Sequence, residues 1–521
     1  MKTTIYKGFL IVFAISLVLQ SCTKDFDKIN NNPNVPALDL AAPNMLLPNA
    51  IESMTDRVFE IFLGHEMGNC WVQHMAKVQY TDEDRYVPRP AVINNTWSSF
   101  YAANGMDIAL LLKIANDKGY DNYKGVALVL QAYVTSVLTD LFGPVPYTEA
   151  WRSAAADGGI LSPAYDDQET IYRALIANLA EANDLLGTGS DAVEGDLLYG
   201  GDTDAWKKFA NSLRMRLLLR MSDRDATFVT TELSAMVADA ATYPIFDSNA
   251  DNAQLIYLGS APNNNPIHEN RKTRDDHRVS LAVVDVMWNN SPNMDYRLAL
   301  YAQNLGAGGG YFNGLPNGLT SAKAAAYQGN GLATTSKLGS YFTAAQAPGV
   351  LMNYSEVLFI LSEAALKGLI PGGEAEAEAK YEEAITASYL QYGEDLVSAV
   401  PAAWIPANWT ADSLAADFYA NDNWTWDATY TTAEKMELIG TQKWLAMFDQ
   451  GLQSWFEWRR IGYPVLTPAE DGLNGGLIPV RVSYPTDEAG RNPTNLAAGV
   501  ALLGGADNLN SRVWWDTADN F

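Results

Sequence analysis

The chain has 521 residues, of which 48% are hydrophobic and 11% aromatic, and its formal net charge is −26. So large a negative charge repels phosphate backbones and argues against nucleic-acid binding. Chains longer than about 300 residues bury about 75% of their unfolded surface, and no linker-like stretch divides this one, so we expect a single large domain over residues 37–521.

The first residues are typical of a secretory signal. Lys2 and Lys7 precede an apolar run from Phe9 to Leu19. This run is shorter than the about 20 residues that a helix needs to span a bilayer. A basic start followed by a short apolar run predicts a signal peptide over residues 1–21.

The cysteine behind this run predicts a lipid anchor. The sequence Leu19-Gln20-Ser21-Cys22 resembles the lipobox of bacterial lipoproteins, in which the cysteine carries acyl chains such as palmitate. The alternative is an ordinary signal with a chance cysteine. Residues 22–36 are polar and rich in Asn, so we expect a lipidated tether. If Cys22 is acylated, only Cys70 remains and no intramolecular disulfide can form.

Most of the remaining chain alternates amphipathic helices with loops. Apolar residues recur every three or four positions from Tyr123 to Leu141, from Asp166 to Leu186 and from Tyr354 to Gly368, which predicts helices. In the second of these, Asp166 is the expected N-terminal cap. Thr431 with Glu434 predicts a capping box for a further helix.

Another helix carries Leu452, Trp455 and Trp458 and should end at Gly462. No stretch alternates polar and apolar residues over a sustained length, so any strands should be short. Long loops are expected over residues 305–320, 404–430 and 466–521. Loops of this length are usually functional or mobile.

Several segments together resemble the SusD/RagB family of outer-membrane nutrient-binding lipoproteins, in the subgroup with an aromatic C-terminus. They run in order through the mature chain: Asp25–Asn34, Thr139–Ala150, Ser162–Tyr172, Asp202–Arg220, Asn353–Gly368, Gln442–Pro464, Ile478–Pro485 and Val513–Asp516. Each segment is short, but the ordered set is specific.

The resemblance implies a mainly α fold, with tetratricopeptide-like helix pairs, long irregular loops and few short strands. It also implies a surface-exposed lipoprotein of the outer membrane that captures nutrient oligomers for a SusC-like TonB-dependent β-barrel transporter. Oligosaccharides are the favoured cargo. The alternative is a lid that binds oligopeptides, as in RagAB-like importers.

No motif predicts an enzyme. Gly-x-Ser-x-Gly and the phosphate-binding Gly-x-x-x-x-Gly-Lys-Ser/Thr loop are both absent. His65-Glu66 begins like a zinc-binding helix, but Asn69 stands where the second histidine should be. A glycosidase pair of carboxylates remains an alternative, because such a pair is recognised by its separation in space.

No cofactor is expected, although one segment allows a weak calcium hypothesis. Asp247–Asn252 begins like an oxygen-ligand loop, but it lacks the glycine at its sixth position, and Leu258 stands where a glutamate is needed. An Asx-rich turn is the favoured interpretation.

Aromatic side chains carry the binding hypothesis, because the apolar face of a sugar packs on a ring while its hydroxyls need polar partners. Tryptophans in the family motifs or on apolar helix faces are expected in the core: Trp206, Trp444, Trp455, Trp458, Trp514 and Trp515. Arg459 and Arg460 are expected to be buried ion-pair partners.

The ligand-binding candidates lie outside those motifs: Trp71, Gln73, Tyr80, Trp97, Tyr311 and Asn313. Family members contact ligands from early helices and middle loops, which favours this set over a later group of Trp404, Trp409, Trp424 and Trp426. The alternative role of that later group is to contact the barrel. A purely structural lipoprotein that seals the barrel is a further alternative.

Overall fold

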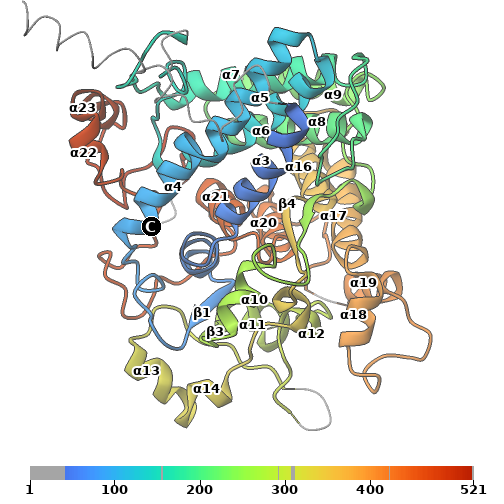
Figure 1. Ribbon diagram of the computed structural model, residues 1–521. Helices are drawn as coiled ribbons and strands as arrows, with labels where there is room; N and C mark the ends of the chain where they lie inside the picture. Colours follow the sequence, from blue (N-terminus) through green and yellow to red (C-terminus); the bar gives the residue numbers. More distant parts are fainter. Residues whose placement is uncertain (1–41, 154–156, 291–292, 307–310, 422, 519–521) are drawn as a thin grey trace, which may run out of the picture.

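A computed structural model describes residues 42–153, 157–290, 293–306, 311–421 and 423–518. The predicted signal peptide, Cys22 and the predicted tether therefore lie outside the described residues. The described chain is mainly helical, with a few short strands (Figure 1). This confirms the predicted fold class.

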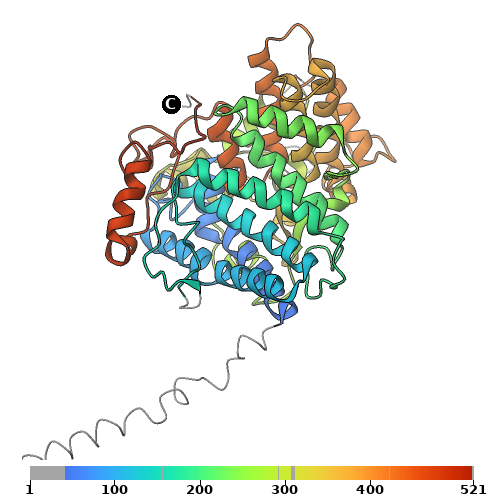
Figure 2. The same ribbon diagram turned by 90° about the horizontal axis from the view of Figure 1, so that it is seen from above.

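The amino-terminal part contains α3 Pro43–Val58, the π-helix η2 Ile61–Asn69, β1 Met75–Lys77, α4 Pro90–Ala102, α5 Asn104–Lys118, α6 Asp121–Phe142, α7 Gln168–Leu185, α8 Thr203–Arg220 and α9 Ala226–Ala238. The long helices of this part pack side by side in chain order, α5 on α6, α6 on α7 and α7 on α8 (Figure 2). Successive helices that pack on their neighbours are the arrangement of tetratricopeptide-like pairs.

The middle part contains η4 Asn249–Asp251, β2 Ala253–Ile256, α10 Pro266–Arg271, β3 His277–Val279, α11 Leu281–Val284, η5 Asp285–Asn289, α12 Leu298–Tyr301, α13 Ser321–Ala326, η6 Tyr327–Gly329, α14 Gly331–Thr334, α15 Ser340–Thr343 and β4 Pro348–Met352. Its elements are short and lie mainly in the lower half of Figure 1. The strands form two antiparallel pairs, β1 with β3 and β2 with β4.

The carboxy-terminal part contains α16 Tyr354–Leu366, α17 Gly373–Leu390, α18 Gly393–Ala399, α19 Ala411–Asn421, α20 Thr432–Ala446, α21 Gly451–Ile461, α22 Glu488–Arg491 and α23 Pro493–Leu502. Helix α16 packs along α17 and α20, while α22 and α23 lie at the edge of the molecule (Figure 1). The capping box of Thr431 and Glu434 and the left-handed Gly462 after α21 are both present.

Helix α6 lies in the middle of the core. It is the one helix in the described part of the chain that is long and apolar enough to cross a membrane, but 94% of its apolar window is buried inside the protein. Buried side chains surround it on all faces, including those of α7 and α8. A helix that is apolar all round is typical of the interior of a large domain.

The predicted N-terminal cap of α7 is wrong. The N-terminal cap of α7 is Asp167, whose carboxylate accepts the backbone N–H of Thr170, whereas Asp166 accepts backbone N–H groups of Tyr147 and Thr148. Asp166 therefore fixes the chain that leaves α6. Asp167, the next residue, caps α7 instead.

The predicted late loops also contain helices. Helix α19 lies within residues 404–430, since Leu414, Ala415 and Phe418 form a short buried stripe at helical spacing. Helices α22 and α23 lie within residues 466–521. Aromatic and glycine-rich flanks masked these short patterns in the sequence.

Candidate functional site: an aromatic pocket

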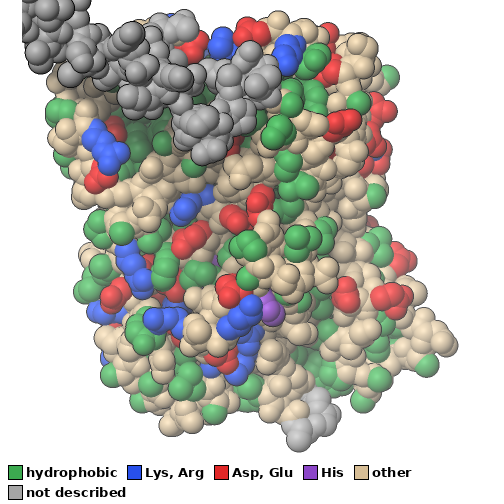
Figure 3. Space-filling model, in the orientation of Figure 1, with side chains coloured by type: hydrophobic (Ala, Val, Ile, Leu, Met, Phe, Trp, Pro, Cys, Tyr) green, Lys and Arg blue, Asp and Glu red, His purple; other side chains and the backbone are tan. Residues whose placement is uncertain are grey.

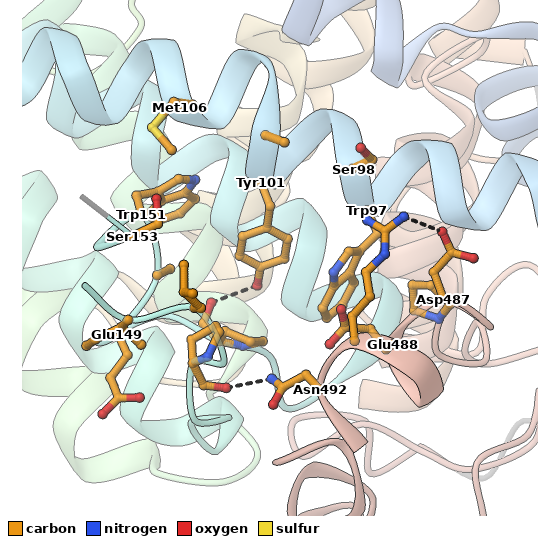
Figure 4. A pocket seen from close by; sticks show the side chains of 18 of the residues that line it. Trp97, Ser98, Tyr101, Met106, Glu149, Trp151, Ser153, Asp487, Glu488 and Asn492 are labelled. Carbon is orange, nitrogen blue, oxygen red and sulfur yellow. Dashed lines mark hydrogen bonds and ion pairs between the residues drawn. The ribbon is translucent and has the colours of Figure 1, made fainter. Parts of the chain in front are cut away.

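A cavity of about 470 Å³ opens between three segments that are distant in sequence. Helix α4 with the start of α5, the chain that follows α6, and the chain around α22 supply its walls (Figure 4). We call it the aromatic pocket, and its lining includes Asn94, Trp97, Ser98, Tyr101, Met106, Glu149, Trp151, Arg152, Ile160, Leu161, Asp487, Glu488, Arg491 and Asn492. Its volume is within the range of small-ligand sites.

Helix α4 sets the position of two of the rings. Pro90 stands in the first turn, where a missing backbone N–H costs nothing. Residues four apart lie on the same side of a helix, so Trp97 and Tyr101 both face the pocket. Their ring centroids are 4.8 Å apart.

Trp97 is anchored in the core and only 9% exposed. Its ring meets that of Phe142 edge to face, with centroids 5.2 Å apart, and that of Tyr484 at 6.3 Å. Aromatic pairs in such arrangements stabilise by about 0.5–1.5 kcal/mol beyond their buried area. This packing fixes the orientation of Trp97 and leaves one part of its ring in the pocket wall.

Tyr101 and Trp151 continue the row of rings. The Tyr101 hydroxyl donates a hydrogen bond of 2.7 Å to the carbonyl oxygen of Pro146, which holds the ring in place. The ring of Trp151 lies 5.7 Å from that of Tyr101, at 32° between their planes. Trp97, Tyr101 and Trp151 thus form three successive rings along one side of the pocket.

Trp151 is held in an unfavourable backbone conformation. Its φ of 57° lies in the left-handed region, which is costly for a bulky residue. Its indole N–H is buried and finds no hydrogen-bond partner among the described residues. Strain and unsatisfied polar groups cluster at ligand sites, so both observations favour a functional role for this side chain.

Gly105 makes the close approach of Trp151 possible. A Cβ atom at this position would lie 1.7 Å from the carbonyl oxygen of Phe100 and 3.0 Å from Nε1 of Trp151. Only glycine therefore allows α5 to begin directly after α4 while the indole of Trp151 lies against the junction of the two helices.

The opposite wall is polar. Asp487 forms an ion pair with Arg491 at 3.0 Å and accepts a hydrogen bond from the Asn94 amide at 3.1 Å. Glu488 accepts a hydrogen bond of 2.8 Å from the Tyr165 hydroxyl. Burial raises the pKa of the Glu488 carboxyl above its ordinary value. These groups offer donors and acceptors opposite the row of rings.

The pocket combines two features that bind sugars. Flat rings can pack against the apolar face of a pyranose, and the facing amides and carboxylates can bind its hydroxyls. On the part of the surface visible in Figure 3, acidic side chains are dispersed and several lie beside basic ones. The overall negative charge thus forms no single large patch on that face.

Of the predicted ligand candidates, Trp97 alone lines this pocket. Trp71 was an incorrect choice, because it is 0% exposed, donates its indole N–H to the carbonyl of Glu83 and packs edge to face on Trp455. Gln73 is buried and donates to the carbonyl of Thr467, although it borders a separate hollow.

The other three candidates lie elsewhere on the molecule. Tyr80 is 56% exposed, and the guanidinium of Arg274 lies 4.2 Å from its ring centroid. Tyr311 is 48% exposed, whereas Asn313 is buried and donates to the side chain of Gln328. Tyr80 and Tyr311 are accessible, but neither lines the aromatic pocket.

Three of the four later tryptophans are packed against other rings. Trp404 stacks on Trp288 with centroids 5.9 Å apart, and Trp409 meets Tyr296 edge to face. Trp424 is half-buried, whereas Trp426 is buried beside Tyr381. The expected core tryptophans Trp206, Trp444, Trp455, Trp458 and Trp515 are buried, and Trp514 is half-buried.

The two arginines of α21 are buried, as predicted. Arg460 pairs with Glu363 at 2.6 Å and with Glu457. Arg459 donates to backbone carbonyls and lies between the rings of Trp455 and Trp515, 4.2 and 4.7 Å from their centroids. Its main role is to join the carboxy-terminal segment to the core.

The two candidate metal segments are engaged by other side chains. The Lys208 ammonium binds the carboxylates of Asp247 and Asp251 at 2.9 and 3.0 Å. Calcium binding at this segment stays an alternative to the favoured Asx-rich turn. His65 lies 3.2 Å from Asp449, to which Asn69 also donates. Within the described ranges, no group of three or more His, Cys, Asp or Glu side chains could hold a metal ion.

Tyr101 and Trp151 were not among the ligand-binding candidates predicted from the sequence. Tyr101 stands four residues after Trp97, a spacing that places two aromatic rings on one face of a helix. Trp151 directly follows the family motif that ends at Ala150. The first signal was present in the sequence, but the meeting of these rings with Glu488 depends on the fold.

The model of one protein family, described as starch-binding and associating with the outer membrane, matches residues 33–485. Among curated protein sequences, none matches the chain. The match covers well over half of the chain and includes the first two walls of the aromatic pocket.

Solved structures with the same fold cover nearly the whole chain. A chitin-binding SusD homologue from Flavobacterium johnsoniae is 27% identical, with a TM-score of 0.70 over 92% of this chain and 99% of its own. A protein named as chitin-binding is 25% identical, with a TM-score of 0.74 over 92% and 100%. A SusD homologue from Bacteroides uniformis, 23% identical with a TM-score of 0.73 over 91% and 99%, shares the fold.

Proposed function

Because the chain belongs to the SusD-like family of starch-binding proteins that associate with the outer membrane, we propose that it captures oligosaccharides in the aromatic pocket and delivers them to a SusC-like TonB-dependent barrel. The row of three rings carries this proposal. In this proposal the pocket only binds the oligosaccharide and breaks no bond in it.

The geometry of the pocket supports a sugar more strongly than a peptide. Trp97, Tyr101 and Trp151 are spaced by 4.8 and 5.7 Å, which is comparable to the length of one sugar ring. The opposite wall carries side-chain carboxylates and amides that suit hydroxyl groups. The names of two similar structures add support for an amino-sugar polymer such as chitin.

Titration calorimetry on the mature chain would test the ligand class. The Cys22→Ala form, which removes the predicted lipid site, would be titrated with chitin oligomers, starch oligomers and oligopeptides. We expect saturable binding of an oligosaccharide. Binding of oligopeptides without any response to sugars would contradict the proposal and favour the RagB-like alternative.

Paired variants would test the site itself. Tyr101→Leu removes the ring and should abolish most of the affinity, whereas Tyr101→Phe keeps the ring and should retain it. Tyr311→Ala removes an accessible ring outside the pocket and serves as the control. Equal affinities of Tyr101→Leu and the unaltered chain would place the ligand elsewhere.

The proposed location follows from the amino-terminal sequence and the family. Acyl chains on Cys22 would hold the protein at the outer membrane, since two or more chains anchor stably. Mass spectrometry of the amino-terminal peptide and fractionation of Cys22→Ala would test the anchor. Co-purification of a large β-barrel protein after mild solubilisation would test the transporter partner, and its absence would count against this role.

A further inference from the structure

The aromatic pocket does not end at Trp151. A second, more open hollow of about 750 Å³ shares Trp151 and Arg152 with it. The residues that complete this second hollow are Ala109, Leu112, Lys113, Asn116, Asp117, Asp157 and Gly158. The two hollows therefore adjoin at these two side chains, and together we call them the groove.

Helices α4 and α5 line this groove along its length. Figure 4 shows Trp97, Ser98, Tyr101 and Met106 one after another along the same stretch of ribbon. The α5 residues of the second hollow, 109, 112, 113, 116 and 117, recur every three or four positions and so share one face. At about 1.5 Å per residue, the span from Met106 to Asp117 adds about 16 Å.

The second hollow is polar and its charges are paired. The Lys113 ammonium lies 3.3 Å from Asp117 and 3.8 Å from Asp157. Arg152 donates to the backbone carbonyl of Asp157 at 3.0 Å. Because these charges neutralise each other, a ligand needs no charge of its own to bind here. The amide of Asn116 and the oxygens of the ion pairs can still form hydrogen bonds with hydroxyl groups.

From this continuity we infer that the ligand is an extended, uncharged, β-linked polysaccharide chain, gripped in its interior by the row of rings while further sugar units lie along α5. The inference rests on the proposed function and adds the shape and length of the ligand. A compact or strongly coiled chain could contact the rings, but it would leave the face of α5 unused.

The affinity for oligomers of increasing length provides the test. Calorimetry with β-1,4-linked N-acetylglucosamine oligomers on the full mature chain should show affinity rising from disaccharide to hexasaccharide by about tenfold or more. The double variant Lys113→Met with Asn116→Ala should lower the affinity for the hexasaccharide and leave that for the disaccharide unchanged. Lys118→Met, at the end of the same helix and outside the groove, is the matched control.

The outcomes separate the two proposals. Equal affinity for short and long oligomers, or no effect of the double variant on the hexasaccharide, would overturn the extended groove and leave capture in the aromatic pocket intact. Absence of binding by any of these oligomers, with binding of starch oligomers, would overturn the β-linked class. Loss of all binding in Tyr101→Leu, together with the length dependence, would support both.

Discussion

Two regions of this protein are rich in aromatic and charged side chains, yet they differ in whether their buried indole N–H groups have hydrogen-bond partners. Around α21, the indole N–H groups of Trp455 and Trp515 donate to Pro479 and Asp140, and Arg459 lies between the two rings. In the aromatic pocket, the indole N–H of Trp151 has no partner among the described residues and its backbone is strained.

The difference distinguishes rings that stabilise the fold from rings that we propose to bind a ligand. A buried N–H with a hydrogen-bond partner contributes to the folded state, whereas the unpaired N–H and the strained backbone of Trp151 cost stability, which favours a role other than stability for this ring. Composition alone does not distinguish the two regions, since both hold tryptophan, tyrosine, arginine and carboxylates. The comparison predicts that variants around α21 act on stability and variants in the pocket act on affinity.

The largest effect should come from the buried ion pairs of α21. Arg460→Ala removes the buried guanidinium that Glu363 and Glu457 share and leaves each carboxylate with one lysine partner, and it should lower the free energy of unfolding by about 3–5 kcal/mol. Urea denaturation measures this change. Arg491→Ala removes an ion pair at the pocket rim from a side chain that is 72% exposed, and it should cost less than about 1 kcal/mol. Similar losses of stability for both variants would show that the two regions do not differ in this way.

The pH dependence of stability should arise partly from His74 in the core. Burial lowers the pKa of its imidazole to about 3, from an ordinary value of 6.5. Below pH 6.5 the unfolded chain binds a proton that the folded chain does not, so stability falls as the pH falls towards 3. Between pH 6.5 and 3, the difference in the free energy of unfolding between the unaltered chain and His74→Gln should therefore shrink by about 1.4 kcal/mol per pH unit. Parallel stability curves would contradict this expectation.

Gly105→Ala should affect both stability and affinity. The added methyl group would meet the Phe100 carbonyl and displace the indole of Trp151. Overpacking of this kind costs about 1–3 kcal/mol, and the disturbed ring should weaken oligosaccharide binding. Denaturation and calorimetry on the same preparation measure both. Gly259→Ala is the control, because no atom lies within 4 Å of the added Cβ and its φ is not positive.

Trp151→Gly should change stability only slightly. Glycine accepts the left-handed backbone without strain, which offsets part of the packing lost with the ring, so the free energy of unfolding should change by about 1 kcal/mol or less. Affinity for an oligosaccharide should nevertheless fall about tenfold or more. A loss of stability as large as that of Arg460→Ala would show that Trp151 is a structural ring.

The sequence predicted much of the local structure. Apolar spacing placed α6, α7 and α16 within a few residues of their ends, and the pair Thr431 and Glu434 located the start of α20. The ordered motifs predicted the mainly α fold and most of the buried tryptophans. These features depend on neighbours in the chain, and a single sequence contains that information.

The tertiary structure decided which rings line the aromatic pocket. Trp71 and Trp97 looked equivalent in the sequence, but Trp71 lies under Trp455 and Trp97 borders the pocket. The pocket joins Trp97 to Trp151 and Glu488 from distant parts of the chain. Periodicity shows which face of a helix is apolar, but the element that covers that face depends on packing across hundreds of residues, and no local pattern encodes it.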